Sequence, residues 1–223
     1  MTGALQHVRL TRPDICSALS AVCQHNQAGA HIAPHFNALK RIFRYLATTK
    51  HHGLRYVSTN RRPENPWVLS MWVDSDYAND RISRRSRAGW IIYLNNDVVA
   101  YGSRLQPPVA RFSTEAEYMA MSMACKELLW TKNILLSIGL RVASPIEVFE
   151  DNQPAAELAK HAMSMKRSRH MDIAHHWIRH YVANGTIKIV YQHTSIQRAD
   201  GMTKALTKGP FEKFAKYVVA DTK

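Results

Sequence analysis

Short apolar stretches bounded by turn-forming residues predict five β-strands in this chain. The first three lie at residues 67–74, 89–94 and 98–102, and Asn95-Asn-Asp97 supplies a turn between the second and the third. Two later strands are predicted at 146–150 and 187–191. Since the first three follow one another closely, we expect an antiparallel meander, with the two later strands running parallel.

Apolar residues at helical spacing predict the remaining elements. A long helix is expected from Ser113 or Thr114, either of which could be its N-cap, to Gly139. Further helices are predicted at 154–161 and 170–184 and near the C-terminus, and two more at 13–26 and 35–49. The order predicts an α/β fold: a five-stranded mixed sheet flanked by helices, with an N-terminal helical extension.

A polar stretch with two prolines at 58–66 has the composition of a linker. We therefore divide the chain into a helical segment at 1–57, the linker at 58–66, the main α/β domain at 67–208 and a helical tail at 209–223.

Composition narrows the class of protein. A chain of 223 residues with 46% hydrophobic content can form a well-cored domain, and it has no apolar run of the roughly 20 residues that a membrane span needs. The three cysteines, Cys16, Cys23 and Cys125, show no CxxC spacing, which argues against a disulfide framework or a thiolate zinc site. We expect an intracellular protein with reduced thiols.

The charge is strongly basic, with 30 Lys and Arg against 17 Asp and Glu and a net charge of +13. Such an excess favours a nucleic-acid partner, although acidic membranes or proteins would also suit it. The densest clusters lie at 83–87 and 166–169, and each is either a phosphate grip or a solvated loop. The arginines we expect to contact substrate are Arg84, Arg85, Arg87, Arg167 and Arg169.

Four carboxylates occupy positions from which side chains can converge. Asp74 and Asp151 end predicted strands, Glu117 lies early in the long helix, and Asp200 opens the last helical segment. Such a set could hold two Mg²⁺ ions for phosphodiester cleavage. A single acid at a strand end is more often a turn or helix cap, and several neighbouring acids are equally charged. Those neighbours are Asp76, Asp80, Glu115, Glu150 and Asp172.

Ordered motifs carry a family resemblance. They are Asp74-Ser-Asp-Tyr-Ala-Asn-Asp80, Arg84-Arg-Ser-Arg-Ala-Gly89, Ser113-Thr-Glu-Ala-Glu-Tyr-Met-Ala120, Asp151-Asn-Gln153, His170-Met-Asp172 and Ala199-Asp-Gly-Met-Thr-Lys204. In order and spacing they resemble the ribonuclease H domain of copia-type LTR retrotransposon Pol polyproteins. Upstream, Leu10-Thr-Arg-Pro-Asp-Ile15 and Ala38-Leu-Lys-Arg-Ile-Phe-Arg-Tyr-Leu46 resemble the segment that joins the reverse transcriptase to that domain.

The resemblance implies a ribonuclease H fold and cleavage of the RNA strand of RNA·DNA hybrids with two Mg²⁺ ions, with Mn²⁺ as a substitute. It places the catalytic and metal-binding roles on Asp74, Glu117, Asp151 and Asp200, with Asp74 bridging the ions. Glu115 points about 200° away from Glu117 on a helix, so only one of the two can be a ligand.

The implied partners are an RNA·DNA hybrid and the reverse-transcriptase part of the same polyprotein. The implied location is cytoplasmic virus-like particles with access to the nucleus, without membrane attachment. Since the chain has no Tyr-x-Asp-Asp motif, reverse transcription is not expected of it. The alternative is a catalytically silent module that binds nucleic acid or serves only as structure.

Some polar residues keep two interpretations. Ser113, Thr114 and Asn152 could contact substrate, and the first two could equally cap a helix. His176 and His180 have the spacing of a zinc pair but lack the HExxH motif, and solvated or packed histidines are the commoner case. His193 precedes Asp200 at a spacing that does not match the family pattern, so we leave it outside the catalytic set.

Overall fold

The computed structural model describes residues 2–26, 33–57, 65–160 and 177–221. The chain forms two compact units. The sheet unit is Val57–Thr203, and the helical unit combines Met1–Tyr56 with Lys204–Lys223. The C-terminal residues thus fold with the N-terminal segment, so the helical unit is built from both ends of the sequence.

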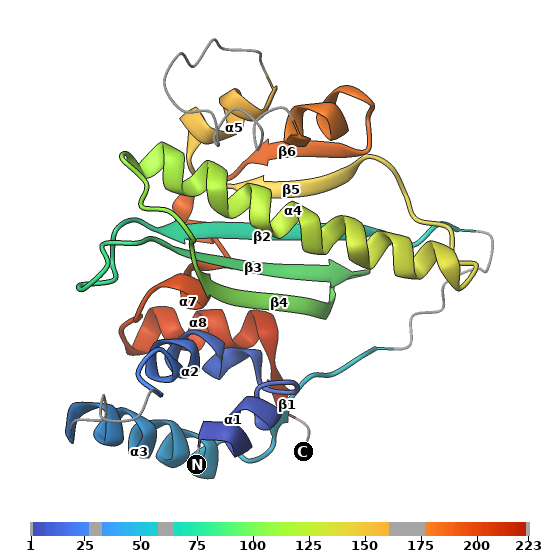
Figure 1. The fold of residues 1–223 in the computed structure, drawn as a ribbon. Helices are drawn as coiled ribbons and strands as arrows, with labels where there is room; N and C mark the ends of the chain where they lie inside the picture. The colour runs from blue at the N-terminus through green and yellow to red at the C-terminus, as the bar shows by residue number, and fades with distance from the viewer. Residues whose placement is uncertain (1, 27–32, 58–64, 161–176, 222–223) are drawn as a thin grey trace. The chain divides into compact units, whose positions relative to one another are not determined.

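A five-stranded mixed sheet forms the centre of the sheet unit (Figure 1). Its strands are β2 (Leu69–Asp76), β3 (Arg87–Leu94), β4 (Asp97–Leu105), β5 (Ile146–Glu150) and β6 (Ile187–Tyr191). They lie in the order β4-β3-β2-β5-β6; β2, β3 and β4 pair antiparallel, while β5 runs parallel to β2 and β6 parallel to β5. This confirms the predicted fold class, meander and parallel pair.

Helices surround this sheet. α4 (Ser113–Ser137) crosses one face of β2 and β3 (Figure 1), and α5 (Gln153–Lys160) follows β5. Residues 177–183 are helical, in agreement with the described part of the predicted 170–184 helix, and Gly185 follows with a φ of 72°. A 3₁₀ turn, η2 (Thr194–Ile196), leads to the short helix α7 (Asp200–Thr203).

Alternation along β2 and β3 decides what each face of the sheet contacts. Met71, Val73 and Trp90 belong to the core that includes α4. Their neighbours therefore point to the opposite face, where Trp72 stacks on Phe149 with a centroid separation of 4.5 Å. Asp74 and Gly89, which are paired in register, lie on this second side, and α7 contacts β2 and β3.

The helical unit has a small core of its own. Its elements are α1 (Thr2–Val8), η1 (Pro13–Ile15), α2 (Cys16–Cys23), α3 (Ala33–Thr48) and α8 (Lys208–Val218). The two-residue strand β1 (His52–Gly53) pairs antiparallel with β7 (Ala220–Asp221). The predicted helices at 13–26 and 35–49 correspond to η1 with α2 and to α3, whereas α1 and the β1–β7 pair were not predicted. The buried core residues are Leu5, Ile15, Leu19, Val22, Leu39 and Ile42.

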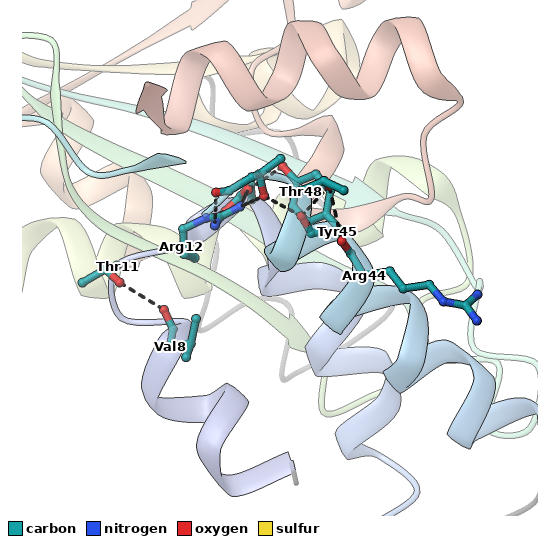
Figure 2. Close-up of polar contacts among 8 residues, drawn as sticks. Val8, Thr11, Arg12, Arg44, Tyr45 and Thr48 are labelled. Atoms are coloured by element: carbon teal, nitrogen blue, oxygen red, sulfur yellow. Dashed lines mark hydrogen bonds and ion pairs between the residues drawn. The ribbon is translucent and has the colours of Figure 1, made fainter. Parts of the chain in front are cut away.

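A buried ion pair joins η1 to the end of α3. Arg12 donates through Nε to Asp14 Oδ1 at 2.9 Å and through NH2 to Asp14 Oδ2 at 2.7 Å. The Tyr45 hydroxyl donates to the same Asp14 Oδ2 at 2.6 Å, and Arg12 NH1 donates to the Thr49 carbonyl at 2.9 Å. Figure 2 shows this network around Arg12 and Tyr45. These hydrogen bonds give partners to a guanidinium and a carboxylate that are almost fully removed from water.

Within the described residues, no helix combines the length and the apolar character needed to cross a bilayer.

Candidate functional site

Three carboxylates from distant parts of the sequence converge at one edge of the sheet unit. Asp74 lies near the end of β2, Glu117 in the second turn of α4, and Asp151 directly after β5. One oxygen from each lies within 4.8 Å of the other two. Asp74 and Glu117 are buried, with 1% and 8% of their surface exposed, and Asp151 is half-buried.

The parallel register of β2 and β5 explains why the two aspartates meet. Trp72 pairs with Phe149, so the same register continued by two residues sets Asp74 beside Asp151. Parallel strands have their carboxyl ends at the same edge of the sheet, and residues just past those ends therefore become neighbours.

The helix contributes Glu117 and not Glu115. Glu115 Oε2 accepts a hydrogen bond from the Arg111 backbone N–H at 2.7 Å, which uses this carboxylate near the helix start. The start of α4 is held by Gln106, whose Nε2 donates to the Ala116 carbonyl at 2.8 Å and to Ser75 Oγ at 3.1 Å. These bonds tie the first turns of α4 to β2, next to Asp74.

The donor set fits a hard divalent cation. All three groups offer carboxylate oxygens, the ligand type preferred by Mg²⁺ and Mn²⁺ over nitrogen or sulfur donors. Three acids held this close repel one another, and a cation between them would offset that repulsion.

A fourth carboxyl lies buried beside the cluster. Glu150 is fully buried; its Oε1 accepts from the Asn152 backbone N–H at 3.0 Å, and its Oε2 has no hydrogen-bond partner among the residues that the structure describes. Burial raises the pKa of Glu150 well above its ordinary value; the negative charges of Asp151 and Asp74 act in the same direction, and the Asn152 amide opposes them. The alternation of β5 was the available signal, since it places Glu150 on the same face as Ile146 and Val148.

Asp200 lies outside this group of three. It begins α7 and is half-buried. One turn later, the hydroxyl of Thr203 donates to Asp74 Oδ2, and this contact connects α7 to the cluster. Sequence patterns did not single out Thr203.

Of the neighbouring acids, Asp80 makes hydrogen bonds within the loop between β2 and β3. Its Oδ1 accepts from the backbone N–H and the hydroxyl of Ser83, both at 2.7 Å. These hydrogen bonds lower the pKa of Asp80 below its ordinary value. Asp172 lies outside the described residues.

Two of the predicted substrate arginines make hydrogen bonds within the sheet unit. Arg87 is buried at the start of β3 and its NH1 lies 3.3 Å from Ser103 Oγ, while Arg85 Nε donates to the Gln106 carbonyl at 2.5 Å. Arg85 is half-buried, and substrate contact by either arginine stays a prediction. Arg84 is exposed at a left-handed backbone position, with a φ of 56°, and stays a candidate. Arg167 and Arg169 lie outside the described residues.

Of the three polar residues predicted to contact substrate or cap a helix, one is a helix cap and two are not. Asn152 Oδ1 accepts from the Ala155 N–H at 2.9 Å, so this side chain caps α5. Neither Ser113 nor Thr114 is the N-cap of α4: Phe112 holds that position, and its own side chain makes no capping hydrogen bond. Ser113 is exposed and Thr114 is half-buried, so substrate contact by either one stays a prediction.

The histidines form no recognised centre among the described residues. His180 is exposed, and its ring packs against Tyr181 with a centroid separation of 5.2 Å. His175 and His176 lie outside the described residues, so the zinc interpretation is untested. His193 is exposed and its Nδ1 accepts from the Ser195 N–H at 3.2 Å, which makes it the cap of η2.

A meander of three strands, two parallel strands and carboxylates at their carboxyl edge define an α/β protein of the ribonuclease H-like class. Sequence comparison then gives the family. The chain is 34% identical over 215 residues to the retrovirus-related Pol polyprotein from transposon RE1 of Arabidopsis thaliana, a match that covers 96% of the chain. It is 32% identical over 211 residues, 94% of the chain, to the Pol polyprotein from transposon TNT 1-94 of Nicotiana tabacum. The chain belongs to the Pol polyprotein family of copia-type retrotransposons.

The chain corresponds to a small part of these relatives, 14% of the length of the first and 15% of the second. No family model matches the chain. Among solved structures, LC11-RNase H1 isolated from compost is similar with a TM-score of 0.47 and 16% sequence identity, over 61% of this chain and 92% of that one.

Proposed function

We propose that this chain is the ribonuclease H part of a copia-type retrotransposon polyprotein and that it hydrolyses the RNA strand of RNA·DNA hybrids. The observation that carries the proposal is the convergence of Asp74, Glu117 and Asp151 within 4.8 Å at the edge of the sheet. Relatives that match almost the whole chain are Pol polyproteins, which supports the same assignment.

In this proposal the three carboxylates hold Mg²⁺ or Mn²⁺, and Asp200 completes the set from α7. Two bound ions would supply an activated water and stabilise the leaving oxygen of the cleaved phosphodiester. Asp74 and Glu117, both nearly excluded from water, orient their oxygens from a strand and a helix. Rigid elements hold such groups more accurately than loops do.

The surface chemistry supports a polyanionic substrate. A net charge of +13 favours nucleic acid, and exposed Arg84 lies in the loop between β2 and β3, which follows Asp74. Because the relatives are Pol polyproteins, we include the reverse-transcriptase portion of the same polyprotein as a partner. We also propose that the protein acts in cytoplasmic virus-like particles with access to the nucleus.

A competing function is that of a silent nucleic-acid-binding module, which the same basic charge would suit. The test is incubation with an end-labelled RNA·DNA hybrid and Mg²⁺, alongside RNA and DNA duplexes of the same sequence. We expect cleavage of the RNA strand of the hybrid alone. A folded sample that binds the hybrid and leaves its RNA intact would exclude the nuclease and favour the silent module.

Asp151→Asn is the informative variant because it keeps the size of the side chain and removes its charge. We expect cleavage to fall at least about 100-fold while the Kd for the hybrid changes by less than about threefold. Glu157→Gln is the matched control, since Glu157 is a half-exposed acid on α5 that pairs with Lys160. Equal losses in both variants would show that the effect is general electrostatics.

A further inference from the structure

Thr203 lies in a position to control the geometry of Asp74. Its side chain is buried, with 2% exposed, and its Oγ1 donates to Asp74 Oδ2 across 129 positions of sequence. The Asp200 carbonyl oxygen lies 3.0 Å from the same hydroxyl. A hydroxyl has one hydrogen to donate, and the charged carboxylate is the stronger acceptor of the two.

The strand beside Asp74 is shaped to admit α7. Gly89 pairs with Asp74 in the β2–β3 register. A Cβ on Gly89 would lie 2.6 Å from Met202 Cβ and 2.7 Å from Thr203 Cγ2, which is too close for carbon atoms. The absence of a side chain at this position lets α7 come close enough for the hydroxyl of Thr203 to reach the carboxylate.

The segment that enters α7 is anchored to the same strand. Gln197, buried at 6% exposure, donates through Nε2 to the Val73 carbonyl at 2.9 Å. Its Oε1 accepts from the Ala199 N–H at 3.1 Å. One side chain thus bridges the residue before Asp74 and the residue before Asp200, and it places α7 relative to β2.

We propose that Thr203 is a positioning residue that sets the orientation of the Asp74 carboxylate for cation binding. The terminal torsion of an aspartate is soft, and the nearby charges of Glu117 and Asp151 push its oxygens away. A hydroxyl bonded to Oδ2 holds the group against that repulsion. Because Thr203 follows Asp200 by one turn, the same contact orients the start of α7. The proposal rests on the proposed function for its cation, and its main test needs no cleavage.

The test measures Mn²⁺ affinity by titration calorimetry without nucleic acid. Thr203→Val keeps the shape of the side chain and removes the hydroxyl, and we expect a 10- to 100-fold weaker Kd, roughly the usual effect of losing a partner of a metal ligand. Thr203→Ser restores the hydroxyl and should stay within about threefold of the wild type. Thr131→Val is the matched control, because the Thr131 hydroxyl donates to the Glu127 carbonyl within α4 at 2.8 Å. It should leave the Kd unchanged.

Two results would overturn the proposal: Thr203→Val binding Mn²⁺ as tightly as the wild type, or Thr203→Ser binding as weakly as Thr203→Val. The second result would show that any change of this side chain weakens binding and that the hydroxyl has no specific role. If Thr203→Val does not fold, comparison of Thr203→Ser with Thr203→Ala isolates the hydroxyl at nearly equal size, and equal affinities in that pair would refute its role.

Cleavage kinetics separate this proposal from the proposed function. In a cleaving wild type, Thr203→Val should lower kcat and leave KM for the hybrid unchanged, whereas an unchanged kcat would count against the positioning role. A wild type whose Mn²⁺ affinity depends on this hydroxyl and that does not cleave hybrid would refute the nuclease and retain the positioning role. A wild type that binds no Mn²⁺ would overturn both.

Discussion

Removal of Asp14 should unfold the helical unit selectively. The Arg12 and Asp14 side chains are 6% and 0% exposed, and two short hydrogen bonds join them. Asp14→Ala leaves the guanidinium buried without its carboxylate and deprives the Tyr45 hydroxyl of its acceptor. The cost of breaking one side of a buried pair is about 3–5 kcal/mol, far above the ~0–1 kcal/mol of an exposed pair.

Hydrogen exchange followed by mass spectrometry measures this cost by segment. Each ~1.4 kcal/mol changes an equilibrium constant tenfold, so amides in α2 and α3 should exchange roughly a hundredfold to a few thousandfold faster in Asp14→Ala. Tryptophan fluorescence reports separately on unfolding of the sheet unit, because all five tryptophans lie in that unit. They are Trp67, Trp72, Trp90, Trp130 and Trp177.

Glu212→Ala is the control for a charge removed from the same unit. Glu212 lies 4.0 Å from Lys208 on α8, and both side chains are largely exposed, at 60% and 90%. Its loss should change exchange in α2 and α3 less than about threefold. If Asp14→Ala exchanged no faster than this control, the buried pair would contribute little to stability and the reasoning would be wrong.

Three more perturbations test the packing and electrostatics near the site. Gly89→Ala should lower the free energy of unfolding in urea by about 1–3 kcal/mol, because α7 must move. Gly3→Ala, in α1, should raise it by ~0.5–1 kcal/mol, because apart from its chain neighbours and its own helix backbone no described atom lies within 4 Å of the added Cβ. Similar values for both variants would contradict this. The raised pKa of Glu150 means that its carboxyl stabilises the fold below its ordinary pKa of 4.5 and loses this effect as the pH rises toward the folded-state value. The free energy of unfolding of Glu150→Gln should therefore rise relative to that of the wild type between pH 4 and 7. If urea titrations gave the same difference in unfolding free energy at every pH in this range, the raised pKa would be refuted. Burial, with the charge of Glu150 as a second cause, raises the pKa of Cys125 to about 12. A disulfide reagent should therefore label half-buried Cys23 before Cys125 in the native protein. Rapid labelling of Cys125 would refute its burial.

Local patterns predicted most of the sheet unit. The strands expected at 146–150 and 187–191 match β5 and β6 to the residue, and the long helix begins at Ser113 as expected. Strand and helix periods are properties of neighbouring residues, which a single sequence displays directly. The β1–β7 pair was missed because two-residue strands from opposite ends of the chain have no period to detect.

The positions of the acids were also predictable, while the roles of their neighbours were not. Asp74 and Asp151 follow apolar stretches, and this placed both at strand ends. Arg87 looked like part of an exposed basic cluster, yet it begins β3 with its side chain buried. A charged residue at a loop boundary can belong to either side, and only the extent of the strand decides which.

The sequence by itself determined which carboxylates stand at strand ends and early in the long helix, because those placements depend on nearby residues. The tertiary structure decided which of them meet: the parallel register sets Asp151 beside Asp74, and α4 brings Glu117 within reach. It also decided that Thr203 contacts Asp74, 129 positions away. Contacts over such separations depend on strand order and helix docking, which the periodicity of a local segment does not encode.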